Sequence, residues 1–212
     1  MNGQLRVVAD VPAAFSLLVR ERRPRSFAAS GGATAHDCYR HLAAFPDLDW
    51  ADSDVVMGDE RWVPVESEDS NEGMARTVLF DGVGARVHSA RSAGPTPAEA
   101  ATAYGTLVES LGALDFVHLG LGEDGHTASL FPGSAALEER VRLVVETGDQ
   151  EHPHERLTLT YPALERARLV VFTVSGTGKR EALARIRAGE DAPAGRVLAE
   201  EVIWLADPAA AG

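Results

Sequence analysis

A histidine and an aspartate stand two residues apart in a glycine-rich segment, so a base would lie beside a carboxylate. The segment is GLGEDGH, and the pair is Asp124 and His126. An imidazole oriented by a carboxylate is suited to general-base catalysis near neutral pH. A lone histidine is more often structural, and the neighbouring carboxylate is what favours a catalytic reading of His126.

Three other segments carry glycine or charge in patterns that suit an anionic ligand. Two are glycine turns, Ser30–Thr34 (SGGAT) and Ser175–Lys179 (SGTGK), and the third is the charged triplet Asp59–Arg61 (DER). Backbone N–H groups at a strand-to-helix glycine turn attract phosphate. Lys179 is the only lysine among 20 basic residues, which indicates a position where a compact ammonium is needed. Each pattern alone is common in ordinary loops, but together they predict an anion site.

Several better-known motifs are absent or incomplete. Gly120, Gly122 and Gly125 match a dinucleotide-binding spacing, but Pro132 follows too soon for the helix that such a turn requires. The SGTGK turn resembles the end of a P-loop, but Thr173 stands where the first glycine belongs. There is no G-x-S-x-G nucleophile and no paired Cys/His spacing for a metal. The sequence therefore favours activated water as nucleophile, with no metal and no organic cofactor.

Composition excludes several classes of protein. The chain has 212 residues, a formal net charge of -12 and one cysteine. This acidity disfavours nucleic acid as a partner, and no apolar run reaches the ~18 residues of a membrane span. We expect a single domain over residues 1–212 that acts on a small molecule in the cytoplasm, with the oligomeric state left open.

Strands and helices alternate along the chain and must position these residues. Strands are expected at 5–9, 26–30, 54–57, 87–89, 115–121, 141–145, 157–160, 169–174 and 202–205, and helices at 12–22, 34–44, 70–80, 97–111 and 177–188. Thr34 and Ser70 are placed to cap two of the helices, and residues 148–155 are expected to form an exposed loop. The alternation predicts an α/β fold with a mostly parallel sheet and helices on both faces, a Rossmann-like three-layer sandwich. Ligands of such folds bind at the carboxyl ends of the strands, where the four segments would meet.

Taken together, these segments resemble the 6-phosphogluconolactonase family, within the glucosamine-6-phosphate isomerase/6-phosphogluconolactonase superfamily. The resemblance covers essentially the whole chain, and its most specific block is Gly120–Pro132 (GLGEDGHTASLFP). The other matching blocks are Asp59–Pro64 with Ser70-Asn71, Arg156–Pro162, Gly176–Lys179 and Trp204–Ala210. The chain departs from the family at Ala33 and Ala35, where a hydroxyl residue and a proline are usual.

The resemblance implies hydrolysis of 6-phospho-D-glucono-1,5-lactone to 6-phosphogluconate in the pentose phosphate pathway. His126 would be the general base, oriented by Asp124, and Arg61 would stabilise negative charge on the substrate or the oxyanion. Asp59 would bind sugar hydroxyls or hold Arg61. The residues expected at the phosphate are Gly31, Gly32, Ala33, Thr34, Arg156 and Lys179.

Two other functions fit parts of the same pattern. Glucosamine-6-phosphate deaminases share a D-G-H turn and a phosphosugar pocket, but their turn continues differently from the HTASLFP found here. A non-catalytic phosphosugar sensor would need an output module, for which 212 residues and an acidic balance leave no room. Both alternatives rank below the lactonase.

Overall fold

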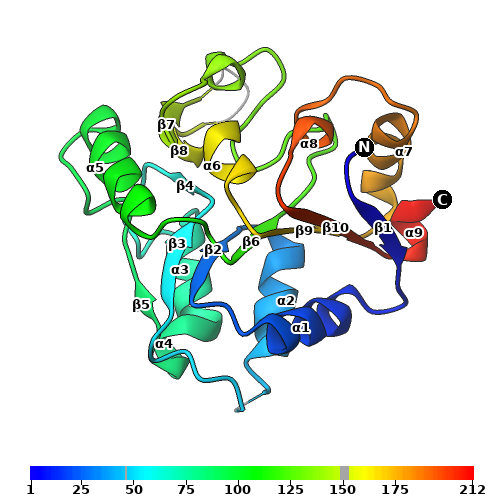
Figure 1. The fold of residues 1–212 in the computed structure, drawn as a ribbon, viewed down its shortest axis with the longest axis horizontal. Helices are drawn as coiled ribbons and strands as arrows, with labels where there is room; N and C mark the ends of the chain where they lie inside the picture. Colours follow the sequence, from blue (N-terminus) through cyan, green and yellow to red (C-terminus); the bar gives the residue numbers. More distant parts are fainter. Residues whose placement is uncertain (46, 149–152) are drawn as a thin grey trace.

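The computed structural model describes residues 1–45, 47–148 and 153–212, and its centre is a seven-stranded parallel sheet (Figure 1). From one edge to the other, its strands are β1 (Gln4–Val7), β10 (Glu201–Ala206), β9 (Leu169–Val174), β6 (Phe116–Leu119), β2 (Ser26–Ala29), β3 (Asp54–Met57) and β5 (Arg86–Val87). All the pairings in this sheet are parallel. The predicted α/β fold with a mostly parallel sheet is confirmed.

The central strands are apolar on both faces because helices cover both sides of the sheet. β9, with sequence LVVFTV, is buried at all six positions, as expected for an unbroken run of mostly β-branched residues. One face packs around Phe15, Phe27 and Tyr39. On the other face, Phe172 and Trp204 stack with ring centroids 3.7 Å apart. Two separate apolar cores therefore hold the sheet between them.

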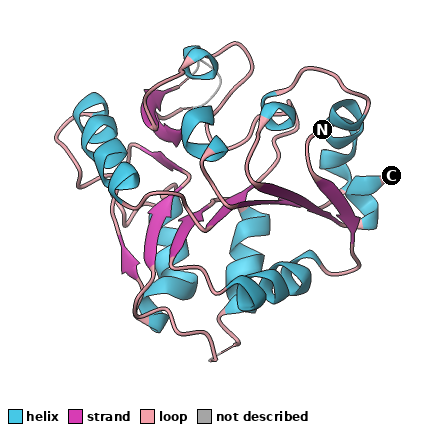
Figure 2. Ribbon diagram, in the orientation of Figure 1, coloured by secondary structure: helices cyan, strands magenta, loops and turns pink. Residues whose placement is uncertain are grey.

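The helices divide between these two faces (Figures 1 and 2). On one face lie α1 (Val11–Arg22), α2 (Ala33–Leu42), α3 (Asn71–Ala75), the π-helix η1 (Arg76–Phe80) and α4 (Asp81–Val83). The others are α5 (Pro97–Ser110), η2 (Ala135–Glu138), α6 (Tyr161–Glu165), η3 (Thr177–Lys179), α7 (Arg180–Arg187), α8 (Pro193–Arg196) and α9 (Pro208–Ala211). No helix of the described residues is long and apolar enough to span a lipid bilayer.

A second, smaller sheet corrects part of the sequence prediction. Strands were expected at residues 141–145 and 157–160 within a mostly parallel sheet, and no strand was expected at residues 59–61. Instead β4 (Asp59–Arg61), β8 (Arg156–Leu159) and β7 (Val144–Thr147) form an antiparallel sheet in the order β4-β8-β7. β4 is three polar residues long, so it shows no apolar alternation. Part of the loop expected at 148–155 lies outside the described residues.

The helix starts agree with the sequence at one position and not at another. Ser70 caps α3, since its Oγ accepts a hydrogen bond from the N–H of Gly73 at 2.9 Å. Thr34 was expected to cap its helix, but the N-cap of α2 is Gly32, and no side chain caps this helix. The glycine is there because the backbone at this turn has a φ of +86°, which favours a residue without Cβ.

An ion pair at the amino end of the sheet predicts a pH dependence of stability. Asp54 accepts hydrogen bonds from Arg86 at 2.9 and 3.0 Å and contacts His88 Nε2 at 2.8 Å. The bond from Arg86, with a smaller contribution from His88, outweighs partial burial and lowers the pKa of Asp54 from 3.8 to about 2. The stabilisation is therefore complete above the unfolded-state pKa and is lost as the pH falls towards 2.

We expect Asp54→Asn to lower the free energy of unfolding near pH 7 by about 1 kcal/mol, because the pair is partly exposed. Urea denaturation should show that the difference in free energy of unfolding between wild type and Asp54→Asn narrows at a pH of about 3. Asp52→Asn is the matched control, because Asp52 and its partner Arg25 are both more than three-quarters exposed. If the difference in free energy of unfolding stayed constant with pH, it would contradict the stabilising role assigned to ionised Asp54.

Candidate active site

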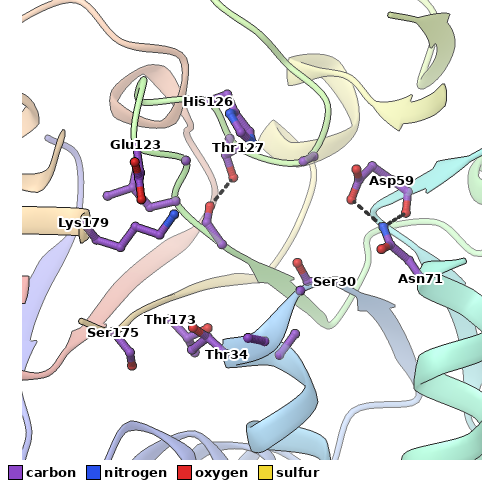
Figure 3. Close-up of a pocket in the computed structure, with 18 of the residues that line it drawn as sticks. Ser30, Thr34, Asp59, Asn71, Glu123, His126, Thr127, Thr173, Ser175 and Lys179 are labelled. Carbon is purple, nitrogen blue, oxygen red and sulfur yellow. Dashed lines mark hydrogen bonds between the residues drawn. The ribbon is translucent and has the colours of Figure 1, made fainter. Parts of the chain in front are cut away.

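A cavity of about 530 Å³ opens at the carboxyl ends of β2, β6 and β9 (Figure 3). It brings together most of the residues expected at the site: Gly31, Gly32, Ala33, Thr34, Asp59, Arg61, His126, Arg156 and Lys179. Asp124 does not line the cavity but is hydrogen-bonded to His126. Asp59 and Asn71 lie on the side opposite Lys179. The volume suits a small-molecule ligand.

His126 and Asp124 form a close pair at the edge of this cavity. His126 Nδ1 lies 2.6 Å from Asp124 Oδ1, and the backbone N–H of His126 donates to the same oxygen at 3.0 Å. Burial disfavours the charged carboxyl, but these contacts with His126 outweigh it and lower the pKa of Asp124. An ionised Asp124 accepts the proton on Nδ1, which leaves the basic lone pair of the imidazole on Nε2.

The turn that carries the pair depends on a glycine. A Cβ on Gly122 would overlap the His126 ring and Asp124 Oδ1, so only glycine leaves room for the pair. The turn is closed by the N–H of Gly122, which donates to the carbonyl of His126 at 2.8 Å. The Thr127 hydroxyl donates to the Gly120 carbonyl at 2.8 Å. These bonds hold the imidazole at one position beside the cavity.

Asp59 is held by neighbours that the sequence does not reveal. Its Oδ2 accepts a hydrogen bond from Ser129 Oγ at 2.6 Å and lies 3.9 Å from Arg156 Nη1. The Asn71 amide donates to the Asp59 carbonyl at 2.9 Å and to Oδ1 at 3.3 Å. Asn71 also packs against Gly31, where a Cβ would overlap its amide. Asn71 therefore links the carboxylate side of the cavity to the first glycine turn.

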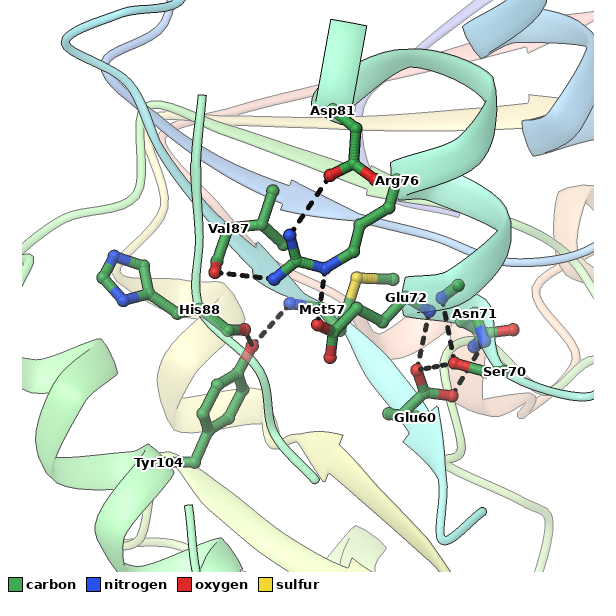
Figure 4. Close-up of polar contacts among 11 residues, drawn as sticks. Met57, Glu60, Ser70, Asn71, Glu72, Arg76, Asp81, Val87, His88 and Tyr104 are labelled. Atoms are coloured by element: carbon green, nitrogen blue, oxygen red, sulfur yellow. Dashed lines mark hydrogen bonds and ion pairs between the residues drawn. The ribbon is translucent and has the colours of Figure 1, made fainter. Parts of the chain in front are cut away.

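A buried carboxylate fixes β4 to the start of α3 (Figure 4). Glu60 accepts hydrogen bonds from Ser70 Oγ at 3.0 Å and from the N–H groups of Asn71 at 2.8 Å and Glu72 at 2.6 Å. Burial raises the pKa of Glu60, although these donors oppose the rise. Glu72, itself buried, pairs with Arg76 at 2.8 Å. The network fixes the positions of the residues on either side of Glu60, both of which line the cavity.

One donor of Arg61 has no hydrogen-bond partner among the described residues. Its Nη1 donates to the carbonyl of Asp69 at 2.6 Å, while the Asp69 carboxylate contacts His154 Nε2 at 3.0 Å. Arg61 Nε is buried and has no hydrogen-bond partner among the described residues. Arg61 lines the cavity, where the charge of its guanidinium is suited to an anionic ligand.

The two glycine turns adopt the same backbone conformation. Gly32 has φ +86° and ψ 173°, and Gly176 has φ +88° and ψ 158°. Each precedes a helical segment with no side-chain cap, so N–H groups at its start remain available to a ligand. Lys179 lies in the second turn, half-buried, and no carboxylate of the described residues pairs with it. The cavity is thus lined by residues of both uncapped turns, including Lys179 of the second turn.

Sequence reasoning gave no role to Asn71 or Ser129. Both stand inside the blocks that carry the family resemblance, and this was the only signal available for them. Their contacts with Asp59 join segments up to 70 residues apart, so spacing along the chain could not reveal them. Ser30 and Thr173, at the floor of the cavity, were likewise not predicted.

The chain matches known proteins over nearly its whole length. The family model for glucosamine-6-phosphate isomerases/6-phosphogluconolactonase matches residues 4–204. The 6-phosphogluconolactonase of Synechocystis is 37% identical, covering 95% of this chain and 90% of its own. The crystal structure of 6-phosphogluconolactonase from Thermotoga maritima superposes with a TM-score of 0.86 at 26% identity, over 96% of this chain and 98% of its own. For the Trypanosoma brucei 6-phosphogluconolactonase the TM-score is 0.83 at 30% identity, over 99% and 98%.

Proposed function

The chain belongs to the glucosamine-6-phosphate isomerase/6-phosphogluconolactonase family, and from this premise we propose that it hydrolyses 6-phospho-D-glucono-1,5-lactone to 6-phosphogluconate. The observation that carries the proposal is the His126–Asp124 pair at one cavity with Lys179 and both glycine turns. A base and an anion site in one cavity are what a phosphorylated lactone requires. The relatives named 6-phosphogluconolactonase support the same reaction.

In the proposed mechanism, His126 Nε2 removes a proton from a water molecule as its oxygen attacks the lactone carbonyl carbon. Asp124 stabilises the imidazolium that forms, and Arg61 stabilises the negative charge on the carbonyl oxygen. The tetrahedral intermediate then expels the ring oxygen, which takes the proton back from the imidazolium. The products are a carboxylic acid, which ionises, and a free hydroxyl group. Asp59, fixed by Ser129 and Asn71, binds sugar hydroxyls.

The proposed setting is the pentose phosphate pathway in the cytoplasm, with a small phosphosugar lactone as the partner. The proposal assigns the phosphate to Gly31, Gly32, Ala33, Thr34, Arg156 and Lys179. The methyl group of Ala33 offers no side-chain hydrogen bond, so this turn would hold the phosphate through backbone N–H groups. Neither a metal nor an organic cofactor is required by this chemistry.

The test of the function is to incubate the purified protein with the phosphorylated lactone and with glucosamine 6-phosphate. Acid release above the spontaneous rate is expected from the lactone, and no ammonia from the aminosugar phosphate. Ammonia release would establish a deaminase instead. Binding without turnover of either compound would indicate a phosphosugar sensor.

Lys179→Ala is expected to raise KM for the phosphorylated lactone with a much smaller effect on kcat. The loss should be about 1.5–3 kcal/mol, or roughly 10- to 150-fold, the scale of a hydrogen bond to a charged group. Lys179→Arg should recover only part of it, because the guanidinium is a wide planar fork. Steady-state kinetics on phosphorylated lactone and unphosphorylated gluconolactone provide the measurement.

The unphosphorylated lactone is the control for Lys179, because it has no phosphate for the ammonium to bind. Equal losses of kcat/KM on the two lactones would show that Lys179 serves the fold or the chemistry. The phosphate assignment would then be wrong.

A further inference from the structure

A line of four polar groups crosses the apolar core directly beneath the cavity. The N–H of Ser30 donates to Tyr39 Oη at 2.7 Å, and Tyr39 Oη lies 2.9 Å from His118 Nδ1. His118 Nε2 lies 2.8 Å from Thr173 Oγ1. Tyr39 and His118 are completely buried, and Thr173 is 2% exposed. The two ends of the line, Ser30 and Thr173, both line the cavity.

The imidazole at the centre of this line is neutral. His118 packs against Phe15, with ring centroids 4.3 Å apart, and no charged group is among its hydrogen-bond partners in the described structure. Burial lowers its pKa to about 3. A neutral imidazole carries one N–H and one lone pair, so it donates at one nitrogen and accepts at the other.

The direction of the hydrogen bonds follows from Tyr39. Its oxygen accepts the N–H of Ser30, and the only other partner of the hydroxyl in the described structure is His118 Nδ1. The phenol proton must therefore be donated to Nδ1, since otherwise a buried O–H would have no acceptor. The proton of the imidazole is then on Nε2, which donates to Thr173 Oγ1.

Thr173 Oγ1 thus accepts the hydrogen bond from His118 Nε2. The hydroxyl proton of Thr173 is then available to be donated to another acceptor. Burial raises the pKa of the Cys38 thiol, and a side-chain hydrogen bond with Thr173 opposes the rise, so the sulfur is one partner for this hydroxyl. A thiol sulfur is a weak acceptor, so a phosphate oxygen would compete with it easily. Thr173 also stands at the end of β9, two residues before the second glycine turn.

We infer that Thr173 is a further phosphate-binding residue and that His118 is the positioning residue that turns the Thr173 hydroxyl proton towards the cavity. The inference rests on the proposed function, because it assigns the ligand of Thr173 to the phosphate of the lactone. Because the direction of these hydrogen bonds is fixed, the Thr173 hydroxyl acts as a hydrogen-bond donor at the floor of the cavity. A donor there favours a phosphate oxygen over a sugar hydroxyl that must itself donate.

The first test compares two substitutions of Thr173. Thr173→Val keeps the shape and removes the hydroxyl, and it should lower the preference for phosphorylated over unphosphorylated lactone by about tenfold or more, through KM. Thr173→Ser should restore most of the preference. Thr106→Val, on the exposed face of α5, is the matched control and should behave as wild type. A Thr173→Val enzyme with the wild-type preference overturns the inference.

The second test examines the direction of the line without using activity. Nitrogen NMR of the imidazole should show a protonated Nε2 and an unprotonated Nδ1 for His118 in the wild-type protein. The opposite tautomer overturns the inference. His118→Leu should shift KM more than kcat, and His118→Gln, whose amide can accept from Tyr39 and donate to Thr173, should recover part of the loss.

The two tests separate this inference from the proposed function. Wild-type protein that hydrolyses neither lactone contradicts the proposed function. Wild-type protein that prefers the phosphorylated lactone, with a Thr173→Val variant that shares the preference, contradicts only the role of Thr173.

Discussion

Replacing His126 with alanine is expected to lower turnover of the phosphorylated lactone by about 10²–10⁴-fold, with a smaller change in substrate binding. The imidazole is the base in the proposed mechanism, and its Nδ1 is held by Asp124 at 2.6 Å. Without it, water must attack the carbonyl unassisted, while the anion-binding groups remain in place. The measurement is kcat from initial rates, after subtraction of the spontaneous opening of the lactone.

The control for this substitution is His36→Ala, because His36 lies on the exposed side of α2 and does not line the cavity. It should retain wild-type turnover. A His126→Ala enzyme whose turnover above the spontaneous rate is unchanged would show that another group activates the water.

Gly122→Ala is expected to cause a loss of turnover of similar size, about 10²-fold or more, although it removes no ionisable group. The new Cβ would overlap the His126 ring and Asp124 Oδ1, so the pair must move or separate. The φ of Gly122 is outside the left-handed region, so alanine introduces a steric conflict without backbone strain. Kinetics should be compared with thermal unfolding, which tests whether the fold survives.

Gly82→Ala is the matched control, because a Cβ there would meet no atom within 4 Å and its φ is also not positive. We expect it to keep full turnover. If Gly122→Ala also kept full turnover, then the close pairing of His126 with Asp124 would not be needed for catalysis.

The sequence predicts those strands whose residues are nearly all apolar. β3 and β9 have the expected bounds. An apolar run that is buried on both faces can be identified as a strand without knowing which strands lie beside it. β4 was not predicted because its residues, DER, are polar, and they pair with β8, almost 100 residues later. β7 and β8 have a local strand signal, but their pairing into a separate sheet with β4 is a product of tertiary contacts.

The site was predicted in outline for a related reason. Parallel strands bring their carboxyl ends to one edge of the sheet, so polar segments that follow different strands must meet. The contacts within that edge were not predictable. The Asn71 link between Asp59 and Gly31, and the line from Ser30 to Thr173, depend on side-chain directions that only the packed core determines.

The order of the strands has a consequence for how the protein folds during synthesis. β10 lies between β1 and β9 and pairs with both, although β1 is at the start of the chain and β10 near its end. While the ribosome is still translating the segment before β10, β1 has no strand to pair with, and the edge of β9 is open. Unpaired strand edges are sites of aggregation. A nascent chain therefore exposes the unpaired edges of β1 and β9 until β10, its last strand, emerges from the ribosome. Chaperone binding or premature termination would act at that stage.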